Sequence, residues 1–430
     1  MLIFVENITN RLRYTFDFIF KERDLTYEFT TNKESFINSE VSKFNYSRAS
    51  FDKEIKSLTP SSILFREGVY NFSINKKQFY KEECLTINDK TDPFASIFYI
   101  ITRYEEYNST LIDHHGRHQG KHSVLHRFNW HHYTMCDRWA EDILAFFKYN
   151  CGLKYENKIH HPQIVPTFDI DKAYAYKHKS PVRNILSNLK DLWTKNTKQL
   201  LERKLVISGS KKDPFDNFDL IYDIQRRGYD VKLFWLLGNY GKFDKNISHK
   251  HKRHIRLIMK MAEISTIGIH PSYKSNSNEF FVHQEIERLQ NILSKHIRNS
   301  RQHFLKLTLP HTYETLIEQE IENDFTMGYA DICGYRAGTA RKHLWFNVMT
   351  NEITKLKIHP FAYMDGTLNE YLKMKPEEAQ EIIAALYIET KKYGGDFTFI
   401  WHNDTINDYG HWKGWSQVLE FTLRLRGIPE

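Results

Sequence analysis

The chain has 430 residues, of which 41% are hydrophobic and 15% aromatic. This composition excludes a disordered protein, and the length favours two domains. The net charge is +8, from 61 Lys and Arg against 53 Asp and Glu, and it looks diffuse. No nucleic-acid-binding motif accompanies this charge, so we expect no nucleic-acid partner. No apolar run reaches the ~20 residues that a transmembrane segment needs.

The ends and the cysteines of the chain point to an ordinary intracellular protein. The four cysteines (Cys84, Cys136, Cys151 and Cys333) are far apart and form no CxxC pair. They therefore predict neither a disulfide framework nor a cysteine-ligated metal. The start of the sequence lacks a basic segment followed by an apolar signal-peptide core, and we expect a cytoplasmic location.

Residues 1–155 predict a smaller domain of mixed α+β type, of unknown function, because strand-like and helical segments alternate there without a regular rhythm. Residues 94–107 and 138–148 carry apolar side chains at helical spacing. Between them, residues 113–118 (DHHGRH) cluster possible metal ligands. No fixed ligand spacing is met, so a surface turn around Gly116 is the favoured interpretation.

From residue 160 to 430 apolar strand candidates alternate with amphipathic helices. The strand candidates are residues 164–168, 231–237, 265–269, 303–307, 329–333, 356–361 and 396–400. Helical patterns cover residues 255–262, 285–296, 313–322 and a segment from Pro376 to Gly394. Seven strand–helix units predict a parallel sheet closed into a β/α barrel, with an open doubly wound sheet as the alternative. No glycine-rich phosphate loop follows a strand, which argues against a nucleotide site.

Two acids follow the first of these strands, in the sequence Pro166-Thr167-Phe168-Asp169-Ile170-Asp171. Residues two apart on a strand face the same way, so Asp169 and Asp171 are expected to project together. Two carboxylates this close repel each other unless a cation or a shared proton separates their roles. The alternative is a turn in which Asp171 caps the next segment.

Most of the later strand candidates also lead into polar side chains. The active site of a parallel barrel lies at the carboxyl ends of its strands, so these residues should gather on one face. The recurrence favours a polar site, either with or without a metal. The residues are His270, Arg301, His303, Arg336, Asp365 and His402.

Four ordered motifs give the chain a family resemblance. They are TFDID (167–171), HPSY (270–273), RQH (301–303) and IWH (400–402). In this order they resemble the polysaccharide deacetylases, the NodB-homology group known as carbohydrate esterase family four, over roughly residues 160–410. The resemblance implies a distorted seven-stranded β/α barrel. Residues 92–94, 103–107 and 115–117 are similar to an uncharacterised domain that precedes such barrels in Bacteroidetes proteins.

The resemblance also implies a role for each matching residue. Asp169 matches the catalytic base, and Arg301 matches the arginine that braces it. Asp171 and His270 match metal ligands, and His402 matches a late catalytic histidine. Zinc is the expected metal, with cobalt, nickel or iron as alternatives.

The chain departs from the family pattern at one ligand. The family places a second metal histidine four residues after the first, and here that position is Lys274. A cation there would repel a bound metal. His303 is the candidate substitute, because it lies near an adjacent strand end.

The implied activity is removal of an acetyl group, N- or O-linked, from a saccharide or glycan precursor in surface polysaccharide synthesis. Arg336, Asp365 and Trp401 are candidate substrate-binding residues, although a structural salt bridge is an equal interpretation of Arg336. Two other functions stay open. One is a catalytically degenerate barrel that only binds saccharide or acts as a scaffold, and the other is a glycoside hydrolase, which also uses two carboxylates.

Overall fold

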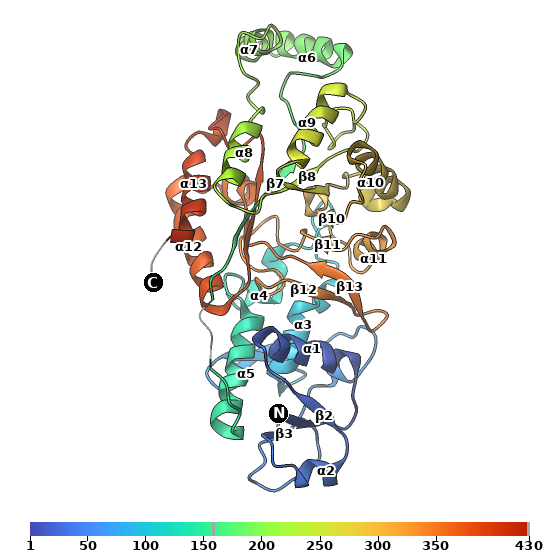
Figure 1. The fold of residues 1–430 in the computed structure, drawn as a ribbon, viewed down its shortest axis with the longest axis vertical. Helices are drawn as coiled ribbons and strands as arrows, with labels where there is room; N and C mark the ends of the chain where they lie inside the picture. The colour runs from blue at the N-terminus through green and yellow to red at the C-terminus, as the bar shows by residue number, and fades with distance from the viewer. Residues whose placement is uncertain (157–159, 428–430) are drawn as a thin grey trace.

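The computed structural model describes residues 1–156 and 160–427. Figure 1 shows an elongated molecule with the N-terminal region, residues 1–156, at one end and the remaining chain forming the middle and the other end. Several helices begin at a side chain that accepts a backbone N–H. Asp92, for example, caps the helix that starts at Pro93.

The N-terminal region contains two small sheets and five helices among the described residues. The first sheet is parallel, in the order β2-β1-β3, and the second is antiparallel, in the order β4-β5-β6. The strands are β1 (Leu2–Phe4), β2 (Glu28–Thr30), β3 (Lys43–Asn45), β4 (Ile74–Gln78), β5 (Glu83–Ile87) and β6 (Lys90–Thr91); the helices are α1 (Asn10–Phe20), α2 (Lys33–Asn38), α3 (Pro93–Ile101), α4 (Val124–Arg127) and α5 (Met135–Cys151).

The apolar core of this region is rich in aromatic rings and includes two residues from far along the chain. Phe346 and Val348 are fully buried within it. Both belong to or directly follow strand β12 (His343–Asn347), and the ring of Phe346 lies 5.2 Å from that of Tyr14. The two parts of the chain therefore share a packed interface.

A nine-stranded sheet organises residues 160–427. Its order is β12-β13-β11-β10-β9-β8-β7-β15-β14, and every neighbouring pair is parallel except β12 with β13. The strands are β7 (Ile164–Ile170), β8 (Lys232–Trp235), β9 (Thr266–Ile269), β10 (Asn299–Ser300), β11 (Asn323–Asp324), β12, β13 (Glu352–Ile358), β14 (Tyr363–Met364) and β15 (Phe397–His402).

The expected barrel closure is not found. In the described part of the chain no ladder of hydrogen bonds joins β14 to β12, so the sheet has two edges. Two strand candidates were wrong. Residues 303–305 form a 3₁₀ turn, and residues 329–333 lie in an irregular segment. The strands that fill those places in the sheet, β10 and β11, have two residues each.

Helices flank the strands on both sides of the view in Figure 1. The helices expected from apolar spacing are present with somewhat different ends, and α12 stops at Gly394 as its sequence predicts. None of the helices in the described ranges has both the length and the apolar character to cross a bilayer. The helices are α6 (Pro181–Trp193), α7 (Thr197–Ile207), α8 (Phe218–Arg226), α9 (Lys252–Ala262), α10 (Glu279–Leu293), α11 (His311–Glu318), α12 (Pro376–Tyr393) and α13 (Ser416–Arg424).

Candidate metal centre

The site begins at the carboxyl end of β7, which is buried along its whole length. Its neighbours β8 and β15 pair with it in parallel, so the segments that follow all three strands emerge at the same edge. Asp169 is the last but one residue of β7, and Asp171 directly follows the strand. Both acids line one cavity of about 430 Å³.

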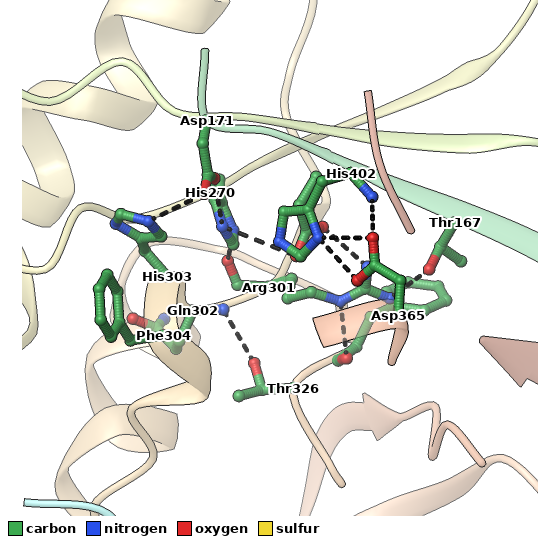
Figure 2. Close-up of polar contacts among 12 residues, drawn as sticks. Thr167, Asp171, His270, Arg301, Gln302, His303, Phe304, Thr326, Asp365 and His402 are labelled. Carbon is green, nitrogen blue, oxygen red and sulfur yellow. Dashed lines mark hydrogen bonds and ion pairs between the residues drawn. The ribbon is translucent and has the colours of Figure 1, made fainter. Parts of the chain in front are cut away.

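Three potential ligand side chains converge in this cavity. The Oδ1 of Asp171 lies 3.3 Å from Nε2 of His270, and its Oδ2 lies 3.2 Å from Nε2 of His303. All three donor atoms fall within 4.8 Å of one another. Figure 2 shows the three side chains pointing toward one another, with the His402 ring beside them. One carboxylate oxygen and two imidazole nitrogens form a donor set that suits zinc or a similar divalent ion.

The far nitrogen of each imidazole is held by a neighbour. Nδ1 of His270 lies 2.6 Å from the backbone oxygen of Arg301, and Nδ1 of His303 lies 2.9 Å from Oδ1 of Asp244. Such partners fix the ring orientation and leave Nε2 as the ligand atom. Oδ1 of Asp171 and Nε2 of His270 are buried, and although they lie 3.3 Å apart, neither makes a hydrogen bond. Buried polar atoms left without a hydrogen bond are costly, so this arrangement fits a bound cation.

The charges of the pair Asp171–His303 are strongly coupled. Burial alone would raise the pKa of Asp171, but the imidazoles of His303 and His270 hold it well below its usual range. Burial alone would lower the pKa of His303, but Asp171 and Asp244 raise it to about 9. In the absence of a metal the site therefore carries a partly exposed carboxylate beside an imidazolium, a charge pattern that a divalent cation could replace by displacing the proton.

Arg301 holds Asp169 through one carboxylate oxygen, and the other oxygen lies near His270. Its Oδ1 accepts a hydrogen bond of 2.8 Å from Arg301, whose guanidinium also donates to Thr167 at 2.7 Å and to the backbone oxygen of Phe325 at 3.0 Å. Its Oδ2 lies 3.7 Å from Nε2 of His270. Arg301 is fully buried, so Asp169 is its charge partner in a low-dielectric setting.

His402 forms a second catalytic candidate at the end of β15. Its Nδ1 lies 2.9 Å from Oδ1 of Asp365, and its backbone N–H donates to Oδ2 of the same carboxylate at 2.9 Å. Burial would lower the pKa of His402, but Asp365 and the nearby acids raise it well above the ordinary value. Because Asp365 holds Nδ1, Nε2 is the nitrogen of His402 left to face the cavity.

Three expected substrate contacts lie elsewhere. Trp401 is fully buried, with its Nε1 3.4 Å from the hydroxyl oxygen of Tyr363, so its ring cannot stack on a sugar. Arg336 pairs with Glu106 at the contact between the N-terminal region and the rest, away from the cavity. Asp365 is fully buried and orients His402 instead of facing the cavity. Trp401 was misplaced because side chains on a strand alternate between core and site, whereas Arg336 forms the structural salt bridge that was the other interpretation.

Lys274 does not intrude on the centre. Its Nζ lies 4.8 Å from the centre of the Phe281 ring, and the residue is absent from the cavity lining. The Lys274 side chain points away from the candidate ligands, so it does not repel a metal bound there. His303, in the segment after β10, lies 3.2 Å from Asp171, at the place where the sequence suggested a substitute ligand.

Two residues of the site were not among the predicted site residues. Asp244 comes from the long loop after β8 and binds His303. Arg117 comes from the DHHGRH segment, which forms a turn closed by hydrogen bonds to Asp113. The turn around Gly116 was expected, but it is not on the surface: His115, Arg117 and His118 are buried. The guanidinium of Arg117 lines the cavity and donates to the backbone oxygen of Phe304 at 3.0 Å.

A larger cavity, of about 1220 Å³, lies between α8, α9 and the segment after β7. It is lined by basic and acidic side chains but contains none of the converging donors described above. The chemistry of the described residues therefore places the candidate site in the smaller cavity.

Comparison with known proteins gives limited similarity. Residues 1–151 match a family of unknown function, DUF7033. No curated protein matches. A solved structure of a putative polysaccharide deacetylase from Mycobacterium smegmatis is 14% identical, with a TM-score of 0.42, over 64% of this chain and 87% of that one.

A second solved structure is a mutant of a CE4-family pseudoenzyme with restored enzymatic activity. It is 8% identical, with a TM-score of 0.28, over 62% of this chain and 64% of that one. Both similarities are weak, and only the geometry of the site indicates a function.

Proposed function

We propose that this protein is a metal-dependent hydrolase that removes an acetyl group from an acetylated saccharide. The observation that carries the proposal is the convergence of Asp171, His270 and His303 within 4.8 Å, beside a braced carboxylate and a cationic histidine in one cavity. A divalent cation held by these three residues would lower the pKa of a water molecule and polarise the acetyl carbonyl.

The chain itself supplies the proton transfers. Because Oδ1 of Asp169 is occupied by Arg301, Oδ2 is the atom that accepts the proton of the attacking water. Arg301 keeps this carboxylate oriented. Because Nδ1 of His402 is held by Asp365, Nε2 is the atom that donates a proton to the departing nitrogen or oxygen. The products are acetate and a free amino or hydroxyl group on the sugar.

The two other functions considered are less well supported. Asp169 and Asp171 both approach Nε2 of His270, so they do not flank a glycosidic bond from opposite sides as a hydrolase pair does. A degenerate binding protein was suggested by the missing ligand at Lys274. His303 now stands beside Asp171, which favours a complete three-residue centre.

The test is acetate release from acetylated glucosamine oligomers and O-acetylated xylan by purified protein with one equivalent of zinc. Asp169→Asn should lower turnover by about 10²–10⁴-fold, because a positioned base contributes that much, while zinc content stays near one per chain. Bound zinc with no acetate release from any acetylated saccharide would contradict the proposed reaction. Saccharide binding without metal would support the binding protein instead.

A further inference from the structure

Helices α6 and α7 form a hairpin that stands off the body of the molecule, at the far end from the N-terminal region (Figure 1). The hairpin is part of the segment between β7 and α8 and has no role in the proposed chemistry. It carries a dense group of exposed apolar side chains.

The apolar face of α6 points away from the protein. Its six large apolar side chains recur at helical spacing and are between 57% and 87% exposed; they are Val182, Ile185, Leu186, Leu189, Leu192 and Trp193. The polar side of α6 packs on α7 instead. Arg203 of α7 donates to Asn188 at 2.7 Å and pairs with Asp191 at 2.6 Å. This orientation is the reverse of a helix that packs on a protein core.

Three apolar side chains of α7 are exposed as well: Leu201, Leu205 and Ile207 are 58%, 39% and 52% exposed. Isolated exposed apolar residues are normal, but six on one helix face mark an interaction site. We define the hairpin face as the six apolar residues of α6 named above.

The excess positive charge of the chain is concentrated around this face and is not diffuse. Residues 177–212 contain ten Lys and Arg against two Asp and Glu, a net of +8, and the other 394 residues contain 51 of each sign. Both acids are already paired, Asp191 with Arg203 and Glu202 with Lys211. Lys190, Lys195, Lys198 and Lys204 are exposed. The partner of the face should therefore be apolar inside and negatively charged at its surface.

An anionic lipid bilayer has that composition. An amphipathic helix with Leu and Trp on one side and Lys along the flanks lies in the plane of the membrane interface. Trp193, the most exposed large apolar residue at 87%, sits beside the α6–α7 turn with Lys195 and Lys198 close in sequence. Trp and Lys are the residues that anchor at headgroup depth.

The hairpin is also tied to the wall of the candidate site. Glu202 of α7 accepts hydrogen bonds from Tyr176, at 3.0 Å, and from Tyr409. Tyr409 lines the cavity that contains Asp169 and His402. The hairpin is therefore connected to the cavity wall through two side chains, Glu202 and Tyr409.

We propose that the α6–α7 hairpin docks the protein on anionic lipid bilayers, with the hairpin face inserted at the level of the headgroups. The proposal goes beyond the acetyl-removing activity and does not depend on it. Binding requires both insertion of the apolar face and attraction of the lysines, because neither a few exposed side chains nor a few charges suffice alone.

The experiment is co-sedimentation of the full chain with vesicles of phosphatidylcholine alone or with 30% phosphatidylglycerol. We expect binding to the second kind only, weakened strongly in 0.5 M NaCl because salt screens the lysines. Quenching of Trp fluorescence by brominated lipid should accompany binding and should fall in Trp193→Ser. No binding to anionic vesicles, or equal binding to neutral ones, overturns the proposal.

Variants assign the binding to the hairpin. Leu189→Ser/Trp193→Ser and Lys195→Glu/Lys198→Glu should each weaken vesicle binding by about tenfold or more. Matched controls change equally exposed residues elsewhere: Ile388→Ser, 63% exposed on α12, and Lys295→Glu/Lys355→Glu. The controls should bind like the parent protein. Equal losses in controls and hairpin variants overturn the assignment.

Two further outcomes would identify a different occupant. Sedimentation velocity without lipid tests for a second copy, and a dimer that Leu189→Ser/Trp193→Ser dissociates would assign the face to self-association. Binding to a 20-mer of single-stranded DNA at the same salt, lost in the lysine variant but kept in the apolar one, would assign the charge to nucleic acid. All these substitutions are at exposed positions, and circular dichroism should show unchanged folding.

Discussion

At the scale of single residues, each acid of the candidate site divides its two oxygens between different neighbours. Asp171 faces His270 with one oxygen and His303 with the other, whereas Asp169 gives one oxygen to Arg301 and keeps the other directed toward His270. If the proposed function holds, this division separates the ligand acid from the base acid two positions before it in the chain.

His303→Ala is the sharpest test of the ligand set. Removing one of three protein ligands should lower zinc affinity by at least 100-fold, whereas Lys274→Ala should leave it unchanged because Lys274 points away. Asp244→Asn should have an intermediate effect of about 10–100-fold, typical of a residue that orients a ligand. Competition with a fluorescent chelator measures all three. Unchanged zinc affinity in His303→Ala would place the third ligand elsewhere.

Asp365→Asn should move the alkaline limit of activity to lower pH. His402 acts as an acid only while protonated, so turnover falls as the pH rises through its pKa, and Asp365 is the main group that raises this pKa. Loss of the carboxylate charge should shift the alkaline limb of the kcat profile down by at least about one pH unit.

The control for this shift is Thr405→Ala, which removes the 2.6 Å hydrogen bond to Asp365 but keeps its charge. Its alkaline limb should stay close to that of the parent protein. An unmoved limb in Asp365→Asn would show that another group donates the proton.

The residues that could be predicted from the sequence are those that follow strands in short motifs. Asp169, Asp171, His270 and His402 fall into this class, and the structure gathers them in one cavity. Asp244 could not be found because a lone acid in a 16-residue loop resembles any surface acid. The prediction that Trp401 contacts the substrate was wrong, because moving one residue along a strand turns the side chain from the site to the core.

At the scale of elements, strand length decided what could be predicted. β7, β8, β9 and β15 are mostly apolar runs of four to seven residues, and the sequence predicts all of them. β10 and β11 have two residues each, which leaves no run to recognise. The strand was predicted instead at residues 303–307, which follow β10 and include the turn that carries His303.

Gly268 marks the tightest packing in β9, two residues before His270. A Cβ at this position would lie 2.6 Å from the Phe234 ring and 2.9 Å from the backbone oxygen of Asn299. Gly268→Ala should therefore lower the free energy of unfolding by about 1–3 kcal/mol, the usual cost of overpacking. Because β10 would have to move, zinc affinity should fall as well.

Gly241→Ala is the matched control, since nothing lies closer than 3.8 Å to its Cβ. Urea denaturation followed by circular dichroism measures both variants. Equal stability of the two would show that the sheet absorbs the extra methyl group.

At the scale of the whole molecule, a buried charge cluster joins the two parts of the chain. Glu106 pairs with Arg103 at 2.7 Å and with Arg336, while Arg103 also donates to Tyr329 at 3.0 Å. Burial would raise the pKa of Glu106, but the two guanidiniums lower it far below the ordinary value. Removing one member of such a cluster leaves an uncompensated buried charge.

Glu106→Gln should lower the free energy of unfolding by about 3 kcal/mol at neutral pH. The lowered pKa means that the carboxylate stabilises the fold above its ordinary pKa of about 4.3, and that this stabilisation is lost as the pH falls below that value. The difference between parent and variant should therefore shrink in acid. Urea titrations at pH 7 and pH 3.5 measure it, and a constant difference would contradict the account.

Arg117 brings a residue of the N-terminal region into the wall of the cavity. A turn of the N-terminal region supplies part of the wall against which a sugar would rest, while the strand ends supply the reacting groups. Changes in that turn could therefore alter which glycan is accepted without disturbing the chemistry. We expect chimaeras that exchange residues 109–122 between related chains to transfer substrate preference and to keep the same metal content.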